Sequence, residues 1–430
     1  KGNQPINEVG SERPAELAQW NIKLTDDNRV ICETCHRPHG AQGQPLLVVE
    51  NDQSKLCRAC HQDERSLIDT RHNLATTAPA SRNLTGANPA ESGPCSACHI
   101  PHNARGPKLW ARSTDPSAGF ASAACTGCHS SSGLSEKKLA GHNHPVGVAL
   151  DKLDVRTGTD GWVIAGDQAP SSGNFQPLPL YDEQGNEVAN DGEIACFTCH
   201  DVHRWQPGAQ TVVDDGEGDG SNSFLRIRSD GESPLCTNCH WQQQSVVDTR
   251  HDTTRTAPES LNSQAHTPAR SGVCGACHLP HNGQAEALWA REYPAEATGM
   301  ERQCFGCHKQ DGPAGKHLTG QFTHPIHVTP EVSNGMALPL YASASGDERQ
   351  IDCGTCHDVH RWSASGVESD PDGEGDARNS FLRIPASDDS QLCIQCHKTQ
   401  SLVIGTDHDL RMSAPGHVNG SGQQHMNSGT

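Results

Sequence analysis

The chain contains ten copies of the motif Cys-x-x-Cys-His, and together these copies use all twenty of its cysteines. This motif is the pattern by which a c-type haem is attached to a polypeptide. The two thiols can form thioethers with one edge of a haem, and the adjacent histidine can bind the iron from one face. Disulfides and zinc ribbons also use paired cysteines, but neither needs a histidine after every pair. The sequence therefore predicts ten covalent haems.

All the cysteines are accordingly candidate haem-binding residues. They are Cys32, Cys35, Cys57, Cys60, Cys95, Cys98, Cys125, Cys128, Cys196, Cys199, Cys236, Cys239, Cys274, Cys277, Cys304, Cys307, Cys353, Cys356, Cys393 and Cys396.

The haems also explain how such a polar chain can fold. Only 33% of the 430 residues are hydrophobic and the formal net charge is -19, which by itself is typical of a disordered chain. Ten apolar macrocycles would supply the buried surface that the side chains lack. We therefore expect a multihaem cytochrome c fold, mostly irregular coil with short α-helices at the haem motifs, little sheet and a haem-packed core. The haem-free chain should be largely unfolded.

The motifs form five modules of two haems each, in the order A-B-A-B-A. The A-type sequence CFTCHDVHRW at 196–205 recurs as CGTCHDVHRW at 353–362, and the B-type sequence CSACHIPHN at 95–103 recurs as CGACHLPHN at 274–282. Each module has a Cys-x-x-Cys-His-x-x-His segment, a plain Cys-x-x-Cys-His segment and one further histidine downstream. Recurrence of this kind indicates one structural unit per repeat.

The modules suggest a domain organisation. We expect an N-terminal segment at 1–31, modules one and two at 32–148, a linker rich in Gly, Pro and Asp at 149–190, modules three and four at 191–330, module five at 331–411 and a C-terminal tail at 412–430.

Each module holds four histidines at matching places, which gives twenty candidate ligands for ten irons with two axial positions each. This count indicates bis-histidine coordination, and the four methionines, which would be the alternative ligands, do not follow the repeat. Bis-histidine irons should have lower potentials than His/Met irons. Six further histidines lack support from the repeat and are expected on the surface: His142, which is the alternative to His144, and His266, His317, His327, His417 and His425. The candidate iron ligands are His36, His39, His61, His72, His99, His102, His129, His144, His200, His203, His240, His251, His278, His281, His308, His324, His357, His360, His397 and His408.

The spacing His-x-x-His suggests a bridge between two haems. On a helix, residues at i and i+3 project from one face. The two axial ligands of one iron lie on opposite faces of the haem, so His39 should bind a different iron from His36. Whether this second iron belongs to the same module or to another is left open by the spacing.

The unit CETCHRPHG at 32–40, followed by KLCRACH at 55–61, resembles the doubled-CXXCH multihaem c-type cytochromes. This resemblance implies an extracytoplasmic electron carrier. The chain is also similar to outer-surface cytochromes and extracellular cytochrome nanowire proteins in haem density and in the His-x-x-His bridges. It departs from the nanowire proteins in haem number and in the A-B-A-B-A order.

Two acidic loops suggest a second cofactor. Asp215, Glu217 and Asp219 alternate with glycine, as do Asp372, Glu374 and Asp376, and this alternation is typical of calcium loops. The alternative is a solvated acidic turn, because the distal glutamate of a full EF-hand is missing.

The acidic balance excludes a generic nucleic-acid binder, and no run of residues is apolar enough for a membrane span. Redox proteins or extracellular electron acceptors are the expected partners, with a homo-oligomeric filament as the expected assembly and the extracellular side or cell surface preferred over the periplasm. We expect no catalytic residue. A soluble electron shuttle is an alternative. A multihaem reductase is another, although it needs an iron with an open or unusual axial site, often marked by lysine in place of the motif histidine, and none of the ten motifs has this change.

Overall fold

The computed structural model describes residues 15–42, 46–149, 178–188, 192–205, 223–292, 300–314, 323–331, 336–343, 345–362, 380–386, 390–414 and 416. The chain divides into two compact units. The N-terminal unit comprises Lys1–Val155 and Ile164–Ser229, and the C-terminal unit comprises Arg156–Val163 and Asp230–Thr430. The division falls inside module three, between its two haem motifs.

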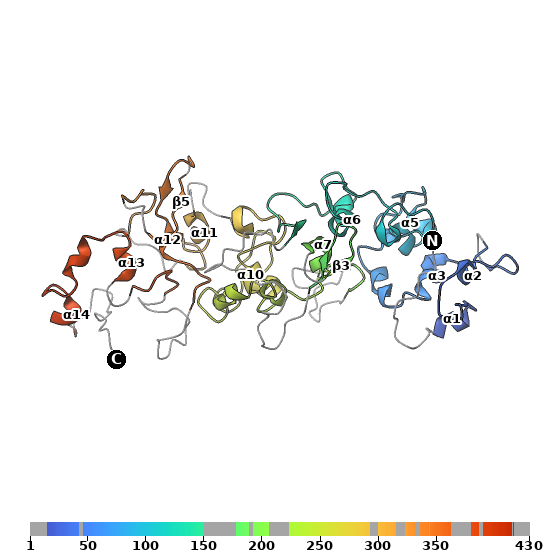
Figure 1. Cartoon of the computed structure of the whole chain (residues 1–430), viewed down its shortest axis with the longest axis horizontal. Helices are drawn as coiled ribbons and strands as arrows, with labels where there is room; N and C mark the ends of the chain where they lie inside the picture. The colour runs from blue at the N-terminus through green and yellow to red at the C-terminus, as the bar shows by residue number, and fades with distance from the viewer. Residues whose placement is uncertain are drawn as a thin grey trace. The chain divides into compact units, whose positions relative to one another are not determined.

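Short helices and turns dominate the fold (Figure 1). The α-helices are α1 (Ala15–Gln19), α2 (Cys32–Cys35), α3 (Lys55–Arg58), α4 (Leu74–Thr77), α5 (Pro89–Ser92), α6 (Phe120–His129), α7 (Cys196–Cys199), α8 (Pro234–Thr237), α9 (Thr253–Thr256), α10 (Pro268–Gly275), α11 (Glu301–Phe305), α12 (Cys353–Cys356), α13 (Gln391–Ile394) and α14 (Leu410–Ser413). The 3₁₀ helices are η1 (Asp52–Ser54), η2 (Asp63–Asp69), η3 (Cys95–Ala97), η4 (Pro107–Leu109), η6 (Trp241–Val246), η7 (Glu286–Leu288) and η9 (Gln400–Val403).

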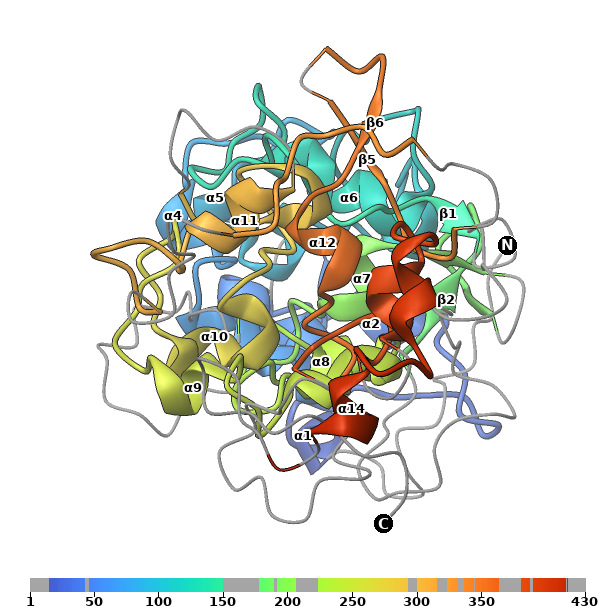
Figure 2. The same cartoon turned by 90° about the vertical axis from the view of Figure 1, so that its left-hand side faces the viewer.

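The strands are only two residues long. The N-terminal unit contains β1 (Val148–Ala149), β2 (Leu180–Tyr181), β3 (Glu187–Val188) and β4 (Glu193–Ile194) in an antiparallel sheet of order β1-β4-β2-β3. The C-terminal unit contains β5 (Tyr341–Ala342) and β6 (Arg349–Gln350), which pair as a hairpin (Figure 2). The expected fold class, mostly coil with short helices at the haem motifs and little sheet, is confirmed.

The first cysteine of every haem motif lies on a helical turn. In the A-type motifs this turn is fixed by a threonine between the two cysteines, since Thr34 and Thr198 accept a hydrogen bond from the backbone N–H three residues earlier, at 3.0 Å in each case. Thr355 accepts the equivalent bond from Asp352, also at 3.0 Å. Such a bond satisfies a donor at the helix start, which is why a four-residue helix can form here.

The helix does not continue through His-x-x-His, so the helical geometry expected for this segment is wrong. The backbone becomes extended at the first histidine, with φ -113° at His36 and -110° at His357. The first-motif histidine of each module instead forms a β-bridge with the chain that returns to it, His36 with Leu47 and His99 with Trp110 for example. A turn then separates the two histidines.

Side-chain cores are small and local. In module one, Leu17 and Ile22 pack with Val48, Val49 and Ala59, so part of the expected N-terminal segment belongs to the packed unit. In the B-type modules, the buried Arg112 donates from Nε to the carbonyl of Ala97 at 2.6 Å and from Nη2 to the hydroxyl of Ser81 at 3.0 Å. Hydrogen bonds from buried side chains, in addition to the small apolar clusters, thus stabilise the fold.

Part of the expected linker at 149–190 is structured. Residues 178–188 form β2 and β3, and Tyr181 is buried in a cluster with Ala121 and Ala195, against which Phe197 packs. This burial holds the strands against α7, which carries a haem motif. The predicted calcium residues Asp215, Glu217, Asp219, Asp372, Glu374 and Asp376 lie outside the described residues, as do His317, His417, His425 and most of the tail at 412–430.

Candidate haem-binding site

Six pairs of imidazole rings lie close together within the two units. Their ring centres are 5.8 to 6.2 Å apart. The N-terminal unit holds His36 with His102, His72 with His129, and His99 with His203. The C-terminal unit holds His251 with His308, His278 with His360, and His324 with His397.

Each of these pairs joins one histidine of a Cys-x-x-Cys-His motif to one histidine outside such a motif. The composition of the pairs is what an iron with one motif ligand and one distant ligand requires. An imidazole nitrogen lies about 2 Å from a bound metal, and the ring centre lies about 1 Å behind that nitrogen, so two imidazoles on opposite faces of one iron have centres roughly 6 Å apart. The observed separations fit that value, and the residues therefore fit a haem iron between the two rings.

Backbone carbonyls orient many of these rings. The Nδ1–H groups of His99 and His278 donate to the carbonyls of Lys108 and Ala287, at 2.7 Å in both cases. Comparable bonds to carbonyl oxygens are made by His129, His144, His200, His324 and His357, at 3.0 to 3.3 Å. A carbonyl can only accept, so Nδ1 carries the hydrogen and the Nε2 lone pair is left for a metal.

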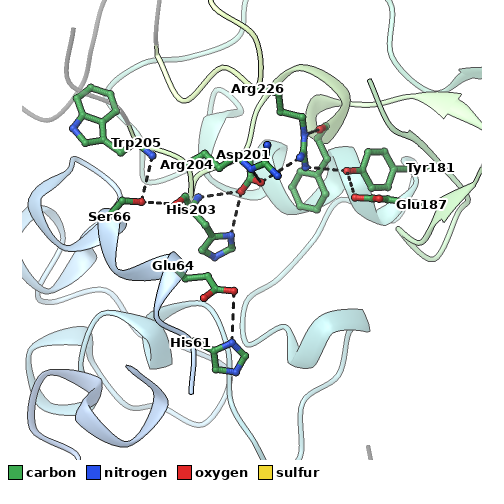
Figure 3. Close-up of polar contacts among 11 residues, drawn as sticks. His61, Glu64, Ser66, Tyr181, Glu187, Asp201, His203, Arg204, Trp205 and Arg226 are labelled. Carbon is green, nitrogen blue, oxygen red and sulfur yellow. Dashed lines mark hydrogen bonds and ion pairs between the residues drawn. The ribbon is translucent and has the colours of Figure 1, made fainter. Parts of the chain in front are cut away.

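A carboxylate takes the same role at the second histidine of His-x-x-His in modules three and five. In the N-terminal unit, Oδ1 of Asp201 lies 3.3 Å from Nδ1 of His203 and accepts from its backbone N–H at 3.1 Å. Arg226 holds this carboxylate from the other side, with Nη1 at 3.2 Å from Oδ2, while its Nε donates to the carbonyl of Phe197 at 2.7 Å and its Nη2 to the hydroxyl of Tyr181 at 3.0 Å. Figure 3 shows this chain of contacts.

The C-terminal unit repeats the arrangement. Asp358 lies between His360, at 3.4 Å, and Arg383, at 3.0 Å, and Arg383 donates to the carbonyl of Gly354 at 2.7 Å. Burial raises the pKa of Asp201 and of Asp358, but their histidine and arginine partners outweigh it and bring each pKa to about 2. Both carboxyls are therefore charged at neutral pH and stabilise a histidine that donates from Nδ1.

Serine contacts fix the backbone at the same two histidines. The hydroxyl of Ser66, in module one, donates to the carbonyl of His203, in module three (Figure 3). Ser245, in module three, makes the equivalent bond to His360, in module five. Each A-type module thus positions a ligand of the A-type module that follows it.

Aromatic residues pack against the downstream histidines of modules one and three. Phe224 packs edge-on against His72 at 4.5 Å and 87°, and Phe381 packs against His251 at 4.4 Å and 82°. Burial lowers the pKa of His72 and of His251 to about 4, with nearby histidines as a second cause. Both rings are therefore neutral at pH 7, which is the form that binds a metal.

The cysteines show in which order the haem motifs follow one another in space. At four module junctions, the first cysteine of one module's second motif forms a hydrogen bond with the first cysteine of the next module. These thiol pairs are Cys57 with Cys95, Cys125 with Cys196, Cys236 with Cys274, and Cys304 with Cys353.

Thiols of the two motifs inside a module are also close. Burial raises the pKa of Cys60, and the charge of Cys35 adds to this effect. In the C-terminal unit, burial and then the charge of Cys396 raise the pKa of Cys356. Within each unit, consecutive haem motifs along the sequence are thus neighbours in space.

Eight candidate ligands are not members of the six pairs. His144, His200, His240 and His281 occupy the same repeat positions as the paired His324, His36, His397 and His102. His39, His61, His357 and His408 form no imidazole pair in the part of the chain that the structure describes. His142 is exposed, whereas His144 is partly buried and burial lowers its pKa.

One polar cluster, formed by Glu301, His327 and Asp352, was not predicted from the sequence. His327, expected on the surface, places Nε2 3.1 Å from Oε1 of Glu301, which is 1% exposed. Glu301 also hydrogen-bonds Asp352, and burial followed by this contact raises the pKa of Asp352. One ligand atom from each of the three residues falls within 4.8 Å of the others. Glu301 and Asp352 each lie just before a haem motif, which is the sequence signal that could have found them.

The comparisons with known proteins give one match, which concerns the haem motifs. A family model described as the doubled CXXCH motif matches residues 25–66 and 266–313, which fall in modules one and four. No curated protein and no solved structure matches the chain. Among the described residues, no helix is long and apolar enough to cross a membrane. The matched motif supports a multihaem c-type cytochrome, a class that generally transfers electrons.

Proposed function

We propose that this protein is a decahaem c-type cytochrome that carries electrons along a chain of closely spaced haems, each with two histidine ligands. The observation that carries the proposal is the set of six imidazole pairs, all composed of one motif histidine and one other histidine. When bound, each haem iron takes up and releases one electron between its ferric and ferrous states.

The chain's own residues would hold the irons in one coordination state. Carbonyls and the carboxylates of Asp201 and Asp358 fix Nδ1 of the ligand rings, so that Nε2 stays directed at the iron. With a histidine on both faces, an iron has no open position for a substrate. This supports an electron carrier over the alternative, a multihaem reductase, which needs such a position.

The thiol contacts support transfer along the whole chain. Cys57 and Cys95 belong to consecutive motifs and their sulfur atoms are neighbours, so the haem edges attached to them would lie side by side. The same holds for Cys304 and Cys353. We infer that electrons pass through the haems in sequence order within each unit.

Haem c cytochromes are extracytoplasmic, and we propose that this one acts extracellularly or at the cell surface as a filament subunit. Redox proteins or extracellular acceptors would be its partners. A soluble shuttle is the alternative form, and electron microscopy of the purified protein distinguishes the two. Calcium at the acidic loops 215–219 and 372–376 is a further proposed ligand.

The central test is ligand removal at one pair. Haem content should be ten per chain by pyridine haemochrome assay and intact mass, and low-temperature EPR should show only low-spin ferric iron in the assembled protein. His203→Ala should convert one iron per chain to high spin, while His142→Ala, which removes an exposed histidine outside the pairs, should leave the spectrum unchanged. If the EPR spectrum of His203→Ala showed as much low-spin iron as that of the wild type, the proposed coordination would be contradicted.

A further inference from the structure

The six imidazole pairs follow two rules, and both rules connect neighbouring modules. By the first rule, the first-motif histidine of a module pairs with the second histidine of His-x-x-His in the next module. His36 with His102, His99 with His203 and His278 with His360 follow this rule. None of these pairs is closed inside one module.

By the second rule, the second-motif histidine of a module pairs with the downstream histidine of the preceding module. His129 with His72, His308 with His251 and His397 with His324 follow it. Both rules hold for a junction from A to B and for a junction from B to A, so they do not depend on module type.

Within the five modules of this sequence, the two rules leave four histidines without an assigned partner. Module one is the first of the five, so the rules pair His39 and His61 with no other histidine of the sequence. Module five is the last, so they likewise pair His357 and His408 with none. These four histidines form no imidazole pair among the described residues, although their repeat equivalents His203, His397, His36 and His72 do.

Exposure of the same residues supports this assignment. His39, His61, His357 and His408 are all exposed, whereas nine of the twelve paired histidines are partly buried. The ring of His61 is 68% exposed. Orientation of the ring at His357 is nevertheless already set, because its Nδ1–H donates to the carbonyl of Ser380 at 3.3 Å.

The cysteines give an independent indication. At each thiol pair, the first cysteine of a second motif meets the first cysteine of the next module. Cys32 and Cys393 are the two first cysteines that take part in none of the four thiol pairs. They are also the two cysteines that are exposed, while the other eighteen are partly buried. Ligand and thiol patterns therefore end at the same two places.

We propose that a second copy of this chain docks head to tail and completes both ends. His39 of the partner subunit supplies the second ligand at the motif of His357, and His408 supplies the second ligand at the motif of the partner subunit's His61. Cys393 then lies beside Cys32 of the partner subunit. Both ligand exchanges run across one contact, from module five of one copy to module one of the next, and repetition of this contact builds an open filament.

This proposal rests on the bis-histidine coordination proposed above, and the test separates the two. The holoprotein is examined by sedimentation velocity, electron microscopy and low-temperature EPR as wild type and as His39→Ala, His408→Ala, His203→Ala and His142→Ala. Wild type should form head-to-tail polymers with low-spin iron only. His39→Ala and His408→Ala should each lose most of this assembly and gain about one high-spin iron per chain, because one ligand exchange fails.

The other two variants are the matched controls. His203→Ala should gain high-spin iron while it keeps assembling, since its pair is internal, and His142→Ala should match the wild type. Added imidazole should return His39→Ala to low spin without restoring its polymers. The head-to-tail proposal fails if His203→Ala shows high-spin iron while His39→Ala and His408→Ala keep the wild-type spectrum and assembly, or if dilute wild-type monomers are fully low-spin. A wild-type spectrum in His203→Ala would instead overturn the coordination itself.

Discussion

Substitution of Arg226 tests how much the polar contacts around the candidate ligand His203 contribute to stability. Its guanidinium holds Asp201, the carbonyl of Phe197 and the hydroxyl of Tyr181, and the side chains of Arg226 and Asp201 are only 15% and 18% exposed. Removal of one partner from a buried ion pair costs about 3–5 kcal/mol. Because Asp201 keeps His203 and is not fully buried, we expect Arg226→Met to destabilise the N-terminal unit by about 2–3 kcal/mol.

For a unit of about 200 residues, this loss corresponds to a decrease of roughly 5–10 °C in the thermal midpoint. The midpoint is measured on the holoprotein by circular dichroism. The pKa of Asp201 is lowered to about 2 in the folded state, so the stabilisation is present above its unfolded pKa near 4 and is lost as the pH falls towards 2. The difference between Arg226→Met and the wild type should therefore be full at pH 5 and above and decrease below pH 4.

Arg204 provides the matched control. It contacts the same carboxylate, with Nε 3.4 Å from Oδ2 of Asp201, but its side chain is 64% exposed. An exposed ion pair contributes about 0–1 kcal/mol, so Arg204→Met should change the midpoint by roughly 3 °C or less. Equal effects of Arg226→Met and Arg204→Met, or an Arg226→Met effect that does not depend on pH, would refute the reasoning.

Phe224→Ala should destabilise the N-terminal unit by about 3 kcal/mol and change the low-spin EPR g values of one iron, because the edge of Phe224 fixes the ring of His72; unchanged g values would contradict this. Glu301→Gln should raise the thermal midpoint at pH 7 and reduce its pH dependence, since the pKa of Asp352 is raised by burial and by Glu301, and the stability linked to it is present at low pH and lost as the pH rises. A lower midpoint would show that the contact of Glu301 with His327 dominates instead. The chain produced without haem attachment should give the far-UV circular dichroism of an unfolded protein, and retained helical signal would contradict the haem-packed core. Calcium should raise the midpoint of chelator-treated protein through the two acidic loops, whereas an unchanged midpoint would favour solvated acidic turns.

The sequence predicts the class of fold because haem attachment leaves a local pattern. Cys-x-x-Cys-His fits a single helical turn, and the first cysteine of every motif lies on such a turn. The threonine in the A-type motifs, Thr34 for example, even specifies the bond that starts the helix. The candidate ligands are likewise visible as residue types that recur with the repeat.

The pairing of these ligands could not be predicted, because it is not local. His36 and His102 are separated by 66 positions in the numbering, and no spacing rule connects them. The helical argument for His-x-x-His also failed, since the chain becomes extended at His36 to bridge Leu47. Its consequence for the ligands still agrees with the pairs, because His99 faces His203 while His102 faces His36.

The imidazole pairs join each module to its neighbours, and this one-module offset affects how the protein can assemble. If each module coordinated only its own irons, five modules would be closed and a second copy would add nothing to any iron. With the proposed offset, every internal module would share ligands with both neighbours, and coordinate bonds would connect the modules in addition to side-chain packing. The same offset leaves a ligand deficit and a ligand surplus at each end, through His61 and His39 at one end and His357 and His408 at the other. Within the five modules of this sequence, the irons at the two ends can gain a second histidine if the array closes on itself or adds copies, and the head-to-tail experiment distinguishes these outcomes by whether dilute monomers are fully low-spin.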